Sequence, residues 1–304
     1  MKTIYHFSGA GNDFVVIDGR EGDVSAFREV ARIEALCKEF KTDGLMILGS
    51  GNAGVDFTME FYNPDGSGGM MCGNGGRCIV AFADYLGIRP ASGEVFLFRA
   101  PDGPHTGVIL ERPEEGLWEV RIKMIDVQGI TPMLGGYFLN TGTRHFVKFV
   151  DDVEKVDVAA EGKALRWDPA FAPVGTNVNF VHIAPDGLHV RTFEKGVEGE
   201  TLACGTGLTA SAIAAYHTGV PSSDSFVGPW PPRNDKGTVI SNNDPSVIPN
   251  PGSSVIPNPE GVKESYRLRA RQDWLSVDFT PGPDEKFTDV YLTGPARLVR
   301  IVSA

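Results

Sequence analysis

Two stretches of the chain place the pattern Cys-Gly-x-Gly directly before an apolar run of helical character. The first stretch, 68–85, reads GGMMCGNGGRCIVAFADY, and the second, 199–216, reads GETLACGTGLTASAIAAY. Each follows a strand-like run, EFYN or VRTFEKG, in which Phe61 and Phe193 stand equally far before their cysteines. Repetition of one supersecondary unit is the signature of an internal duplication. We therefore expect two similar halves that face one cleft.

The rest of the chain is dominated by short runs typical of β-strands, which mix β-branched with aromatic residues and often alternate in period two. One amphipathic helix is expected at 26–40, with an apolar face formed by Phe27, Val30, Ile33, Leu36, Cys37 and Phe40. The strand-like runs are FVVID, GLMIL, VDFTMEFY, VFLFRA, TGVILE and WEVRIKM in the first half, and GYFLNTGTRHFVKFV, TNVNFVHI, LHVRTFEKG, WLSVDFT and DVYLTGPARLVRIV in the second. Many strands and few helices predict an α+β fold rather than a Rossmann sheet.

The charge of the chain argues against several classes of partner. Its 304 residues are enough for about two domains. The formal net charge is -11 and no Lys/Arg block stands out, so we expect no nucleic acid, no membrane and a small-molecule partner. The N-terminal run soon reaches Asp13 and resembles neither a signal peptide nor a spanning helix. Because four cysteines are too few for a disulfide scaffold, we expect a cytoplasmic protein with reduced thiols.

One region has the composition of a loop. From 221 to 261 the sequence is rich in Pro, Ser, Asn and Gly, and the hexapeptide SVIPNP occurs twice. Such a composition cannot hold a packed core. We therefore expect a flexible accessory insertion at 221–261.

A glycine-rich run at 49–54, GSGNAG, fits the dinucleotide-binding pattern G-x-G-x-x-G. That pattern needs a helix next, so that the helix N-terminus can face the pyrophosphate. Here VDFTMEFY follows, with the alternation of a strand. We therefore expect a hairpin loop and no nucleotide.

The cysteines and histidines form no familiar metal motif. Cys72 and Cys78 have the spacing Cys-x5-Cys with no histidine nearby, which matches no common zinc site. The six histidines are scattered, and H-E-x-x-H does not occur. Cys37 and Cys78 are expected to fill the core from apolar helical faces. The sequence therefore predicts no metal and no cofactor.

Cys72 and Cys204 each stand at the entrance of a predicted helix. Free backbone N–H groups and the helix dipole at such a position lower the pKa of a thiol and bind an anion such as a carboxylate. Two thiols on opposite faces of one carbon suit a 1,1-proton transfer at the α-carbon of an amino acid, with one base as thiolate and the other as thiol. The structural alternative is two buried cysteines capped by ordinary glycine-rich turns. The second helix, apolar or small almost all round, is expected to be buried within a sheet.

Five motifs, in order along nearly the whole chain, resemble the diaminopimelate epimerases. They are SGAGNDF at 8–14, NPDGSGGMMCGNGGRC at 63–78, GTNVNFVHI at 175–183, EKGVEGETLACGTG at 194–207 and YLTGPA at 291–296. The resemblance implies two related domains, each a mostly antiparallel or mixed sheet rolled around a central helix, with the active site in the cleft. We place the first domain at 1–128 plus 288–304, and the second, which contains the insertion, at 129–287.

The same resemblance implies an amino-acid isomerase that interconverts LL- and meso-2,6-diaminopimelate without pyridoxal phosphate, in lysine and peptidoglycan biosynthesis. It is compatible with a homodimer. Cys72 would be the base toward the LL substrate and Cys204 its partner acid, with the roles reversed for the meso form. His145 and Glu194 would lie beside the reacting carbon. The substrate-binding residues that the resemblance implies are Asn12, Asn63, Gly73, Asn74, Asn177, Lys195, Gly205 and Thr206.

Three positions depart from the family pattern. Gly44 stands where the family often has Gln, and Thr143-Arg144 stands where it usually has Asn or Ser followed by Pro. Lys195 replaces an Arg expected to grip the far carboxylate of the substrate, and a lysine cannot reproduce the bidentate fork of that Arg. The reaction type is therefore better supported than the substrate.

Two other functions stay open at this point. A proline racemase-like enzyme would share the first cysteine motif, but Asn74 stands where those enzymes have His. A thiol redox or binding protein would join Cys72 to Cys204 in a switchable disulfide.

Overall fold

The computed structural model describes residues 2–52, 54–69, 71–91, 93–222, 262–271 and 273–303. The chain divides into two compact units. Unit 1 contains Met1–Lys123 with Thr293–Ala304, and unit 2 contains Met124–Leu292. Of the insertion expected at 221–261, all but Pro221 and Ser222 lies outside the described residues.

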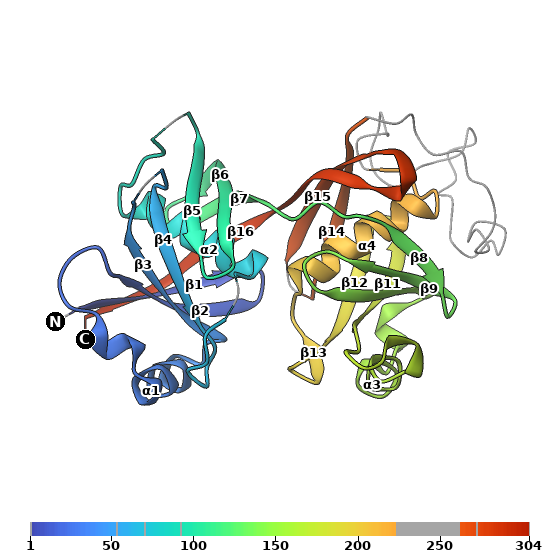
Figure 1. Ribbon diagram of the computed structural model, residues 1–304, viewed down its shortest axis with the longest axis horizontal. Helices are drawn as coiled ribbons and strands as arrows, with labels where there is room; N and C mark the ends of the chain where they lie inside the picture. Colours follow the sequence, from blue (N-terminus) through green and yellow to red (C-terminus); the bar gives the residue numbers. More distant parts are fainter. Residues whose placement is uncertain are drawn as a thin grey trace. The chain divides into compact units, whose positions relative to one another are not determined.

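Unit 1 is a sheet closed around a helix. Its elements are β1 (Thr3–Gly9), β2 (Asn12–Asp18), α1 (Val30–Phe40), β3 (Gly44–Ser50), β4 (Phe57–Tyr62), α2 (Gly73–Tyr85), β5 (Val95–Ala100), β6 (Gly103–Glu114), β7 (Leu117–Lys123) and the second part of β16 (Phe287–Ser303). The strands follow the order β1-β2-β3-β4-β5-β6-β7-β16, and β16 pairs back onto β1. Helix α2 lies among these strands, whereas α1 lies on the outside (Figure 1).

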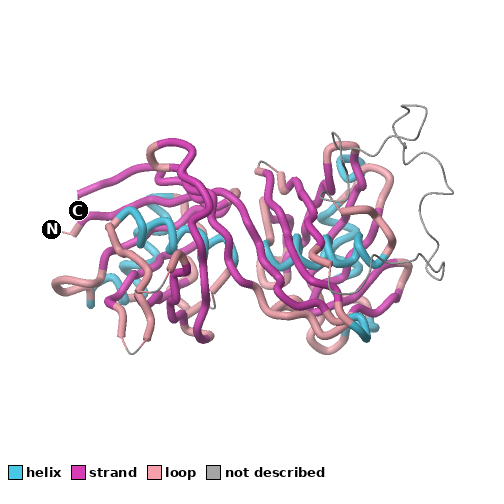
Figure 2. Tube along the Cα trace, turned by 90° about the horizontal axis from the view of Figure 1, so that it is seen from above, coloured by secondary structure: helices cyan, strands magenta, loops and turns pink. Residues whose placement is uncertain are grey.

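Unit 2 has the same plan. Its elements are β8 (Ile130–Met133), β9 (Gly136–Asn140), β10 (Arg144–Phe149), α3 (Val158–Arg166), β11 (Asn177–Ala184), β12 (Gly187–Glu194), β13 (Gly199–Thr201), α4 (Gly205–His217), β14 (Glu264–Arg269), β15 (Trp274–Pro281) and the first part of β16. The strand order is β8-β9-β10-β11-β12-β14-β15-β16, with β13 beside β12. An isolated bridge joins Val127 to Phe287, so that the segment before β8 meets β16. Figure 2 shows the helices of each unit with strands on either side.

The two central helices are buried almost all round, as the sequence predicted for α4. In α2 every residue from Gly73 to Asp84 is buried, and Phe82 packs its ring against Tyr5 and Phe7 at centroid distances of 4.8 and 5.6 Å. In α4 the buried side chains are mainly those of alanine and other small residues. A helix that hides every face must be wrapped by other elements, and the closed sheets supply that wrapping.

The duplication predicted from the cysteine stretches is present in the topology. Each unit has an antiparallel hairpin (β1-β2 or β9-β10), then an outer helix leading to a parallel strand pair (β2-β3 or β10-β11). An antiparallel strand follows (β4 or β12), then the cysteine and the central helix, and then a parallel neighbour (β5 or β14). The two units are therefore copies of one supersecondary plan.

The register of the repeat differs by one residue from the sequence expectation. The ladders equate Leu45–Tyr62 in unit 1 with Val178–Phe193 in unit 2, so Phe193 corresponds to Tyr62 and not to Phe61. Phe193 belongs to the cluster under the outer helix α3, and a Cβ added at Gly162 of that helix would meet its ring. Because successive strand residues point to opposite faces, Phe61 and Phe193 lie on opposite faces of their equivalent strands, although they stand equally far before their cysteines.

The helix expected at 26–40 is broken. Ser25–Arg28 forms a short 3-10 turn, Glu29 is extended with φ -74° and ψ 129°, and α1 begins only at Val30. The extended residue resets the helical phase, so Val30 is 53% exposed instead of lying on the apolar face. Helix α3 was not expected, because only three of its residues are buried and its apolar stripe is short.

The hairpin expected around GSGNAG is confirmed. Strands β3 and β4 pair antiparallel from Leu45–Tyr62 to Ser50–Phe57, and Gly51, Asn52 and Gly54 of the glycine-rich run lie between the two strands. No helix follows to carry a phosphate site.

Candidate active site

Cys72 is the N-cap of α2. Its backbone is extended, with φ -100° and ψ 150°, and its Sγ accepts a hydrogen bond from the backbone N–H of Gly75 at 3.2 Å. A Cβ at position 75 would lie 3.2 Å from this Sγ and 3.4 Å from Sδ of Met46. Glycine therefore lets the helix end close tightly on the thiol, which is held where the helix dipole favours negative charge.

Cys204 is the N-cap of α4 and is held differently. Its side chain makes no capping hydrogen bond. Instead, its Sγ lies 3.4 Å from Oγ1 of Thr206, within the distance of a sulfur hydrogen bond. Cys204 is buried, whereas Cys72 is half-buried. The two thiols occupy equivalent positions of the repeat but have different partners.

In unit 1, Arg77 orients two of the predicted substrate-binding residues. Its guanidinium is fully buried and donates to Oδ1 of Asn74 at 2.9 Å. Since a guanidinium can only donate, the amide nitrogen of Asn74 faces the other way and donates to Oδ1 of Asn12 at 2.5 Å. The oxygen of Asn12 is thus occupied, and its amide nitrogen is the group that it can offer to an anion. Asn63 follows β4 and donates to Oγ of Ser67 instead.

In unit 2, three predicted residues lie on neighbouring strands. His145 of β10 and Asn177 of β11 are direct partners in the parallel ladder. Val178 pairs with Phe193 in the antiparallel β11–β12 ladder. The next position along places Asn177 opposite Glu194 of β12, on the same face of the sheet. Asn177 donates to the carbonyl of Arg144 at 2.9 Å and accepts from the backbone N–H of Lys195 at 2.8 Å. Asn177 therefore fixes the backbone of Lys195, whose side chain is exposed.

His145 is buried beneath the N-terminus of α4. Its Nε2 lies 2.9 Å from Oγ1 of both Thr206 and Thr143, and its Nδ1 lies 3.1 Å from Nδ2 of Asn179. Burial lowers the pKa of His145 from 6.5 to about 3. The imidazole is therefore neutral at physiological pH and cannot be the group that carries a positive charge in the resting site.

This buried imidazole predicts acid sensitivity. The unfolded chain binds a proton at this histidine near pH 6.5 and the folded chain only near pH 3, so stability falls as the pH drops through this window. Between pH 7 and pH 5 the group should remove about 2 kcal/mol from the free energy of unfolding. Urea denaturation at both pH values, compared between wild type and His145→Gln, isolates this share. An equal loss in both proteins would contradict the prediction.

The sequence reasoning missed several residues that shape the two sites. Asn179 and Thr192 lie on the buried face of unit 2 that carries His145, and Arg77 is one helical turn beyond Cys72. Asn179 had a visible signal: it repeats the polar character of Asn177 two positions later, on the same face of an otherwise apolar strand. Arg77 had none, because nothing in the sequence distinguishes a buried arginine from a solvent-exposed one.

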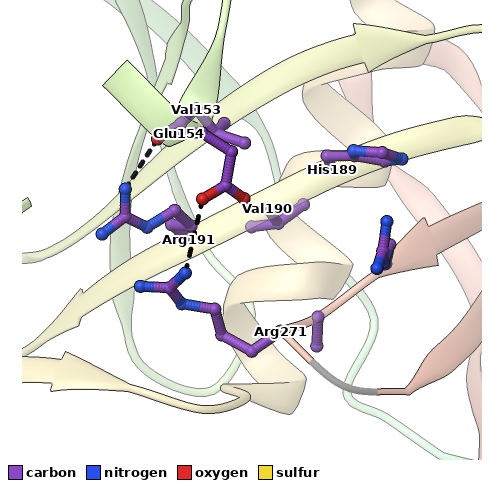
Figure 3. A pocket seen from close by; sticks show the side chains of 8 residues that line it. Val153, Glu154, His189, Val190, Arg191 and Arg271 are labelled. Atoms are coloured by element: carbon purple, nitrogen blue, oxygen red, sulfur yellow. Dashed lines mark hydrogen bonds and ion pairs between the residues drawn. The ribbon is translucent and has the colours of Figure 1, made fainter. Parts of the chain in front are cut away.

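A shallow pocket on unit 2 does not contain the predicted residues. It is lined by Val153, Glu154, His189, Val190, Arg191, Arg269, Ala270 and Arg271 (Figure 3). Arg191 forms a bidentate pair with Glu200 and donates to the carbonyl of Val153, and Arg271 pairs with Glu154 and Glu200. Both arginines already have carboxylate partners, so this pocket is lined by a salt-bridge network and by none of the predicted site residues.

The described residues contain neither a metal-binding cluster nor a membrane-spanning helix. Across 2–222 and 262–303, short gaps aside, no group of three or more His, Cys, Asp or Glu side chains is arranged to hold a metal ion. Within the same part of the chain, no helix has the length and apolar character needed to span a bilayer.

Comparison with known proteins agrees with this architecture. The sequence model of the diaminopimelate epimerase family matches residues 4–95 and 137–227. The chain is 42% identical over 225 residues to the diaminopimelate epimerase of Chlorobaculum tepidum, covering 71% of this chain and 84% of that protein. It is 39% identical over 228 residues to that of Flavobacterium psychrophilum, covering 74% of this chain and 85% of that protein.

Solved structures share the fold at low sequence identity. A phenazine biosynthesis protein of the PhzF family from Bacillus anthracis has a TM-score of 0.67 at 11% identity, over 100% of this chain and 98% of that one. A hydroxyproline epimerase from Agrobacterium vitis has a TM-score of 0.58 at 12% identity, over 99% and 91%. The family match covers both repeats, and the relatives are about 40% identical over more than two thirds of the chain. The chain therefore belongs to the diaminopimelate epimerase family.

Proposed function

We propose that this chain interconverts LL- and meso-2,6-diaminopimelate by a two-base 1,1-proton transfer. One observation carries the proposal: Cys72 and Cys204 are the N-caps of the two central helices, at equivalent points of a duplicated topology. Inversion at a carbon needs one base for each face, and a duplicated unit supplies one thiol from each copy. Cys72 takes the α-proton of the LL substrate while Cys204 donates, and the roles reverse for the meso form.

The helix ends also suit the charge that the reaction develops. When the α-proton leaves, negative charge spreads into the adjacent carboxylate. The backbone N–H groups of Gly73-Asn74 and Gly205-Thr206 belong to first helical turns, where N–H groups have no partner within the helix. Donors that are already in place stabilise such an anion without reorganisation. Asn12, Asn63 and Asn177 are the proposed side-chain contacts, with His145 and Glu194 beside the reacting carbon.

The proposal is tested by isotope exchange. The protein is incubated under reducing conditions with LL-diaminopimelate in D2O, and NMR follows α-deuterium and the meso isomer. We expect deuterium to enter the product at the inverted carbon without added metal or pyridoxal phosphate. Absence of both exchange and inversion under reducing conditions would overturn the proposal. A disulfide between Cys72 and Cys204 that cycles without the amino acid would favour the redox alternative.

Lys195 is proposed to hold the far carboxylate of the substrate as a point charge. A charge-assisted contact of this kind is typically worth about 1.5–3 kcal/mol, so Lys195→Ala should lower kcat/KM by roughly ten- to a hundredfold. The loss should appear mainly in KM, because the contact is far from the reacting carbon. Steady-state kinetics with diaminopimelate measures both parameters.

Two further variants sharpen this test. Lys195→Met keeps the stem without the charge and should behave like Lys195→Ala, whereas Lys163→Ala removes an exposed lysine from α3 and should be neutral. Unchanged KM in both Lys195 variants would mean that this lysine is not a ligand. Rapid turnover of an amino acid with a single carboxylate would then show that diaminopimelate is not the preferred substrate. The proposed two-thiol mechanism would be unaffected.

We further propose that the chain works in the cytoplasm as a homodimer. A reducing compartment keeps both thiols in the form that proton transfer requires. Val299 and Ile301 of β16 are apolar and 52% and 48% exposed, and a second copy can cover them. Sedimentation at several protein concentrations measures the mass, and a monomer throughout would contradict the dimer.

A further inference from the structure

Asn179 occupies the centre of a buried polar chain in unit 2. It lies on β11 and is fully buried. Its Oδ1 accepts from the hydroxyl of Thr192 at 3.0 Å, and its Nδ2 lies 3.2 Å from the carbonyl of Phe146 and 3.1 Å from Nδ1 of His145. These three partners come from β10 and β12, the strands on either side.

These partners determine where the proton of His145 sits. The Phe146 carbonyl can only accept, so the Asn179 atom that faces it must be the amide nitrogen. That same NH2 group faces Nδ1 of His145, which must therefore accept. In a neutral imidazole one nitrogen donates when the other accepts, so the proton of His145 is on Nε2. The burial that keeps this imidazole neutral reinforces the assignment.

The chain continues from His145 to the thiol. Nε2–H faces the hydroxyls of Thr206 and Thr143 at 2.9 Å each. A Thr206 hydroxyl that accepts from Nε2 has its own proton free to donate, and Sγ of Cys204 lies 3.4 Å from that oxygen. Thr143 stands where the family usually has Asn or Ser, and its hydroxyl still places a hydrogen-bonding group beside Nε2.

The packing of α4 is built around this amide. A Cβ added at Gly207 would lie 2.3 Å from Oδ1 of Asn179, so only glycine allows the helix end to approach it. The equivalent position in unit 1 is Met46, which faces Gly75. No polar side chain occupies this position beneath Cys72, whose Sγ instead takes the backbone N–H of Gly75. The polar chain thus serves one thiol of the pair.

We propose that Asn179 is a positioning residue: it holds the proton of His145 on Nε2, so that the Thr206 hydroxyl donates to the Cys204 thiolate. This inference rests on the proposed role of Cys204 as an acid and base, and it assigns His145 the role of an orienting donor. It predicts that one thiolate is stabilised by side chains and the other by helix backbone.

The wild-type protein gives a first test that needs no variant. With 15N-labelled histidine, NMR should find the His145 ring protonated on Nε2, with no titration between pH 5 and pH 8. A ring protonated on Nδ1, or one that titrates with a midpoint near 6.5, would overturn the proposal.

The second test follows the thiols directly. Alkylation of Cys204 and Cys72 by iodoacetamide is followed by peptide mass spectrometry as a function of pH, with Cys72 as an internal control. Asn179→Leu should slow Cys204 alkylation at neutral pH by about two- to tenfold, the share of one hydrogen bond, and raise its pH midpoint by up to about one unit. Thr206→Val should do the same, and Thr206→Ser should restore the wild-type profile.

Thr192→Val is the matched control for Asn179→Leu. It removes a buried hydroxyl from Oδ1 of Asn179 but leaves the NH2 group on His145. Cys204 should then keep its wild-type profile, whereas an equal slowing in both variants would point to general loosening of the core and contradict the relay. Both measurements use the protein without substrate. A failure of the relay is therefore distinguishable from a failure of epimerase activity, which the exchange experiment in D2O reads separately.

Discussion

Cys72→Ala and Cys204→Ala should each lower kcat/KM for epimerisation by about 10²–10⁴-fold, the range that a positioned acid or base contributes. In the proposed mechanism each thiol serves a different face of the α-carbon, so neither can replace the other. Coupled assay of LL and meso turnover, run from both directions, measures the loss. A variant that retains near-normal turnover would remove that cysteine from the mechanism.

Isotope exchange separates the roles of the two thiols. On the proposed assignment, Cys204→Ala keeps the base for the LL substrate and should still exchange the α-proton of LL-diaminopimelate, returning deuterium to the same face without inversion. Cys72→Ala should exchange only the meso form. Cys78→Ala is the matched control, because Cys78 is a fully buried thiol on the same helix as Cys72, and burial raises its pKa far above the ordinary range. If both active-site variants exchanged both isomers, the assignment of one thiol to each face would be wrong.

Phe82→Ala should lower the free energy of unfolding by about 3–5 kcal/mol. Phe82 is fully buried at the centre of unit 1, where its ring meets those of Tyr5 and Phe7. Its loss leaves a cavity between the central helix and the sheet that wraps it. Urea denaturation, with hydrogen exchange of β1 and β7 to follow unit 1 separately, measures the change.

Val30→Ala is the control for this stability prediction. Val30 begins α1 and is 53% exposed, so its truncation should change the free energy of unfolding by less than about 0.5 kcal/mol. A loss below about 1 kcal/mol for Phe82→Ala would mean that α2 is not held by its side-chain packing.

The sequence predicted those parts of the fold that depend on local periodicity. Strand alternation located β4, β5 and β7, and the all-round apolar character of 205–216 identified α4 as a buried helix. The prediction of the helix at 26–40 was wrong, because a local pattern does not show where tertiary packing interrupts a helix. Glu29 breaks a continuous apolar pattern through one extended residue, and no residue type announces that break.

For the candidate site, the structure bears on the helix starts and on the contacts of the predicted residues. Helix entrances were expected at Cys72 and Cys204, and α2 and α4 begin directly after them. Of the glycines in these first turns, Gly207 is the one where an added Cβ would lie 2.3 Å from Oδ1 of Asn179. The partners of the thiols were not predictable from the sequence. Cys72 is contacted by the backbone N–H of Gly75 and Cys204 by the side chain of Thr206, although both cysteines stand in the same Cys-Gly-x-Gly pattern. Arg77 and Asn179 act from inside the units, where sequence patterns do not distinguish a structural polar group from an orienting one.

The strand β16 has a consequence for biosynthesis. It completes the ring of unit 1 by joining β7 to β1, and its first residues lie beside β15 in unit 2. Along the chain it follows every other described strand. The ribosome therefore synthesises β16 after the strands with which it pairs. Until β16 is made, the edges of β1 and β7 in the nascent chain are unpaired. Exposed edges template association with other chains, so a stop codon before residue 293 should yield an aggregating product rather than a slightly shortened enzyme.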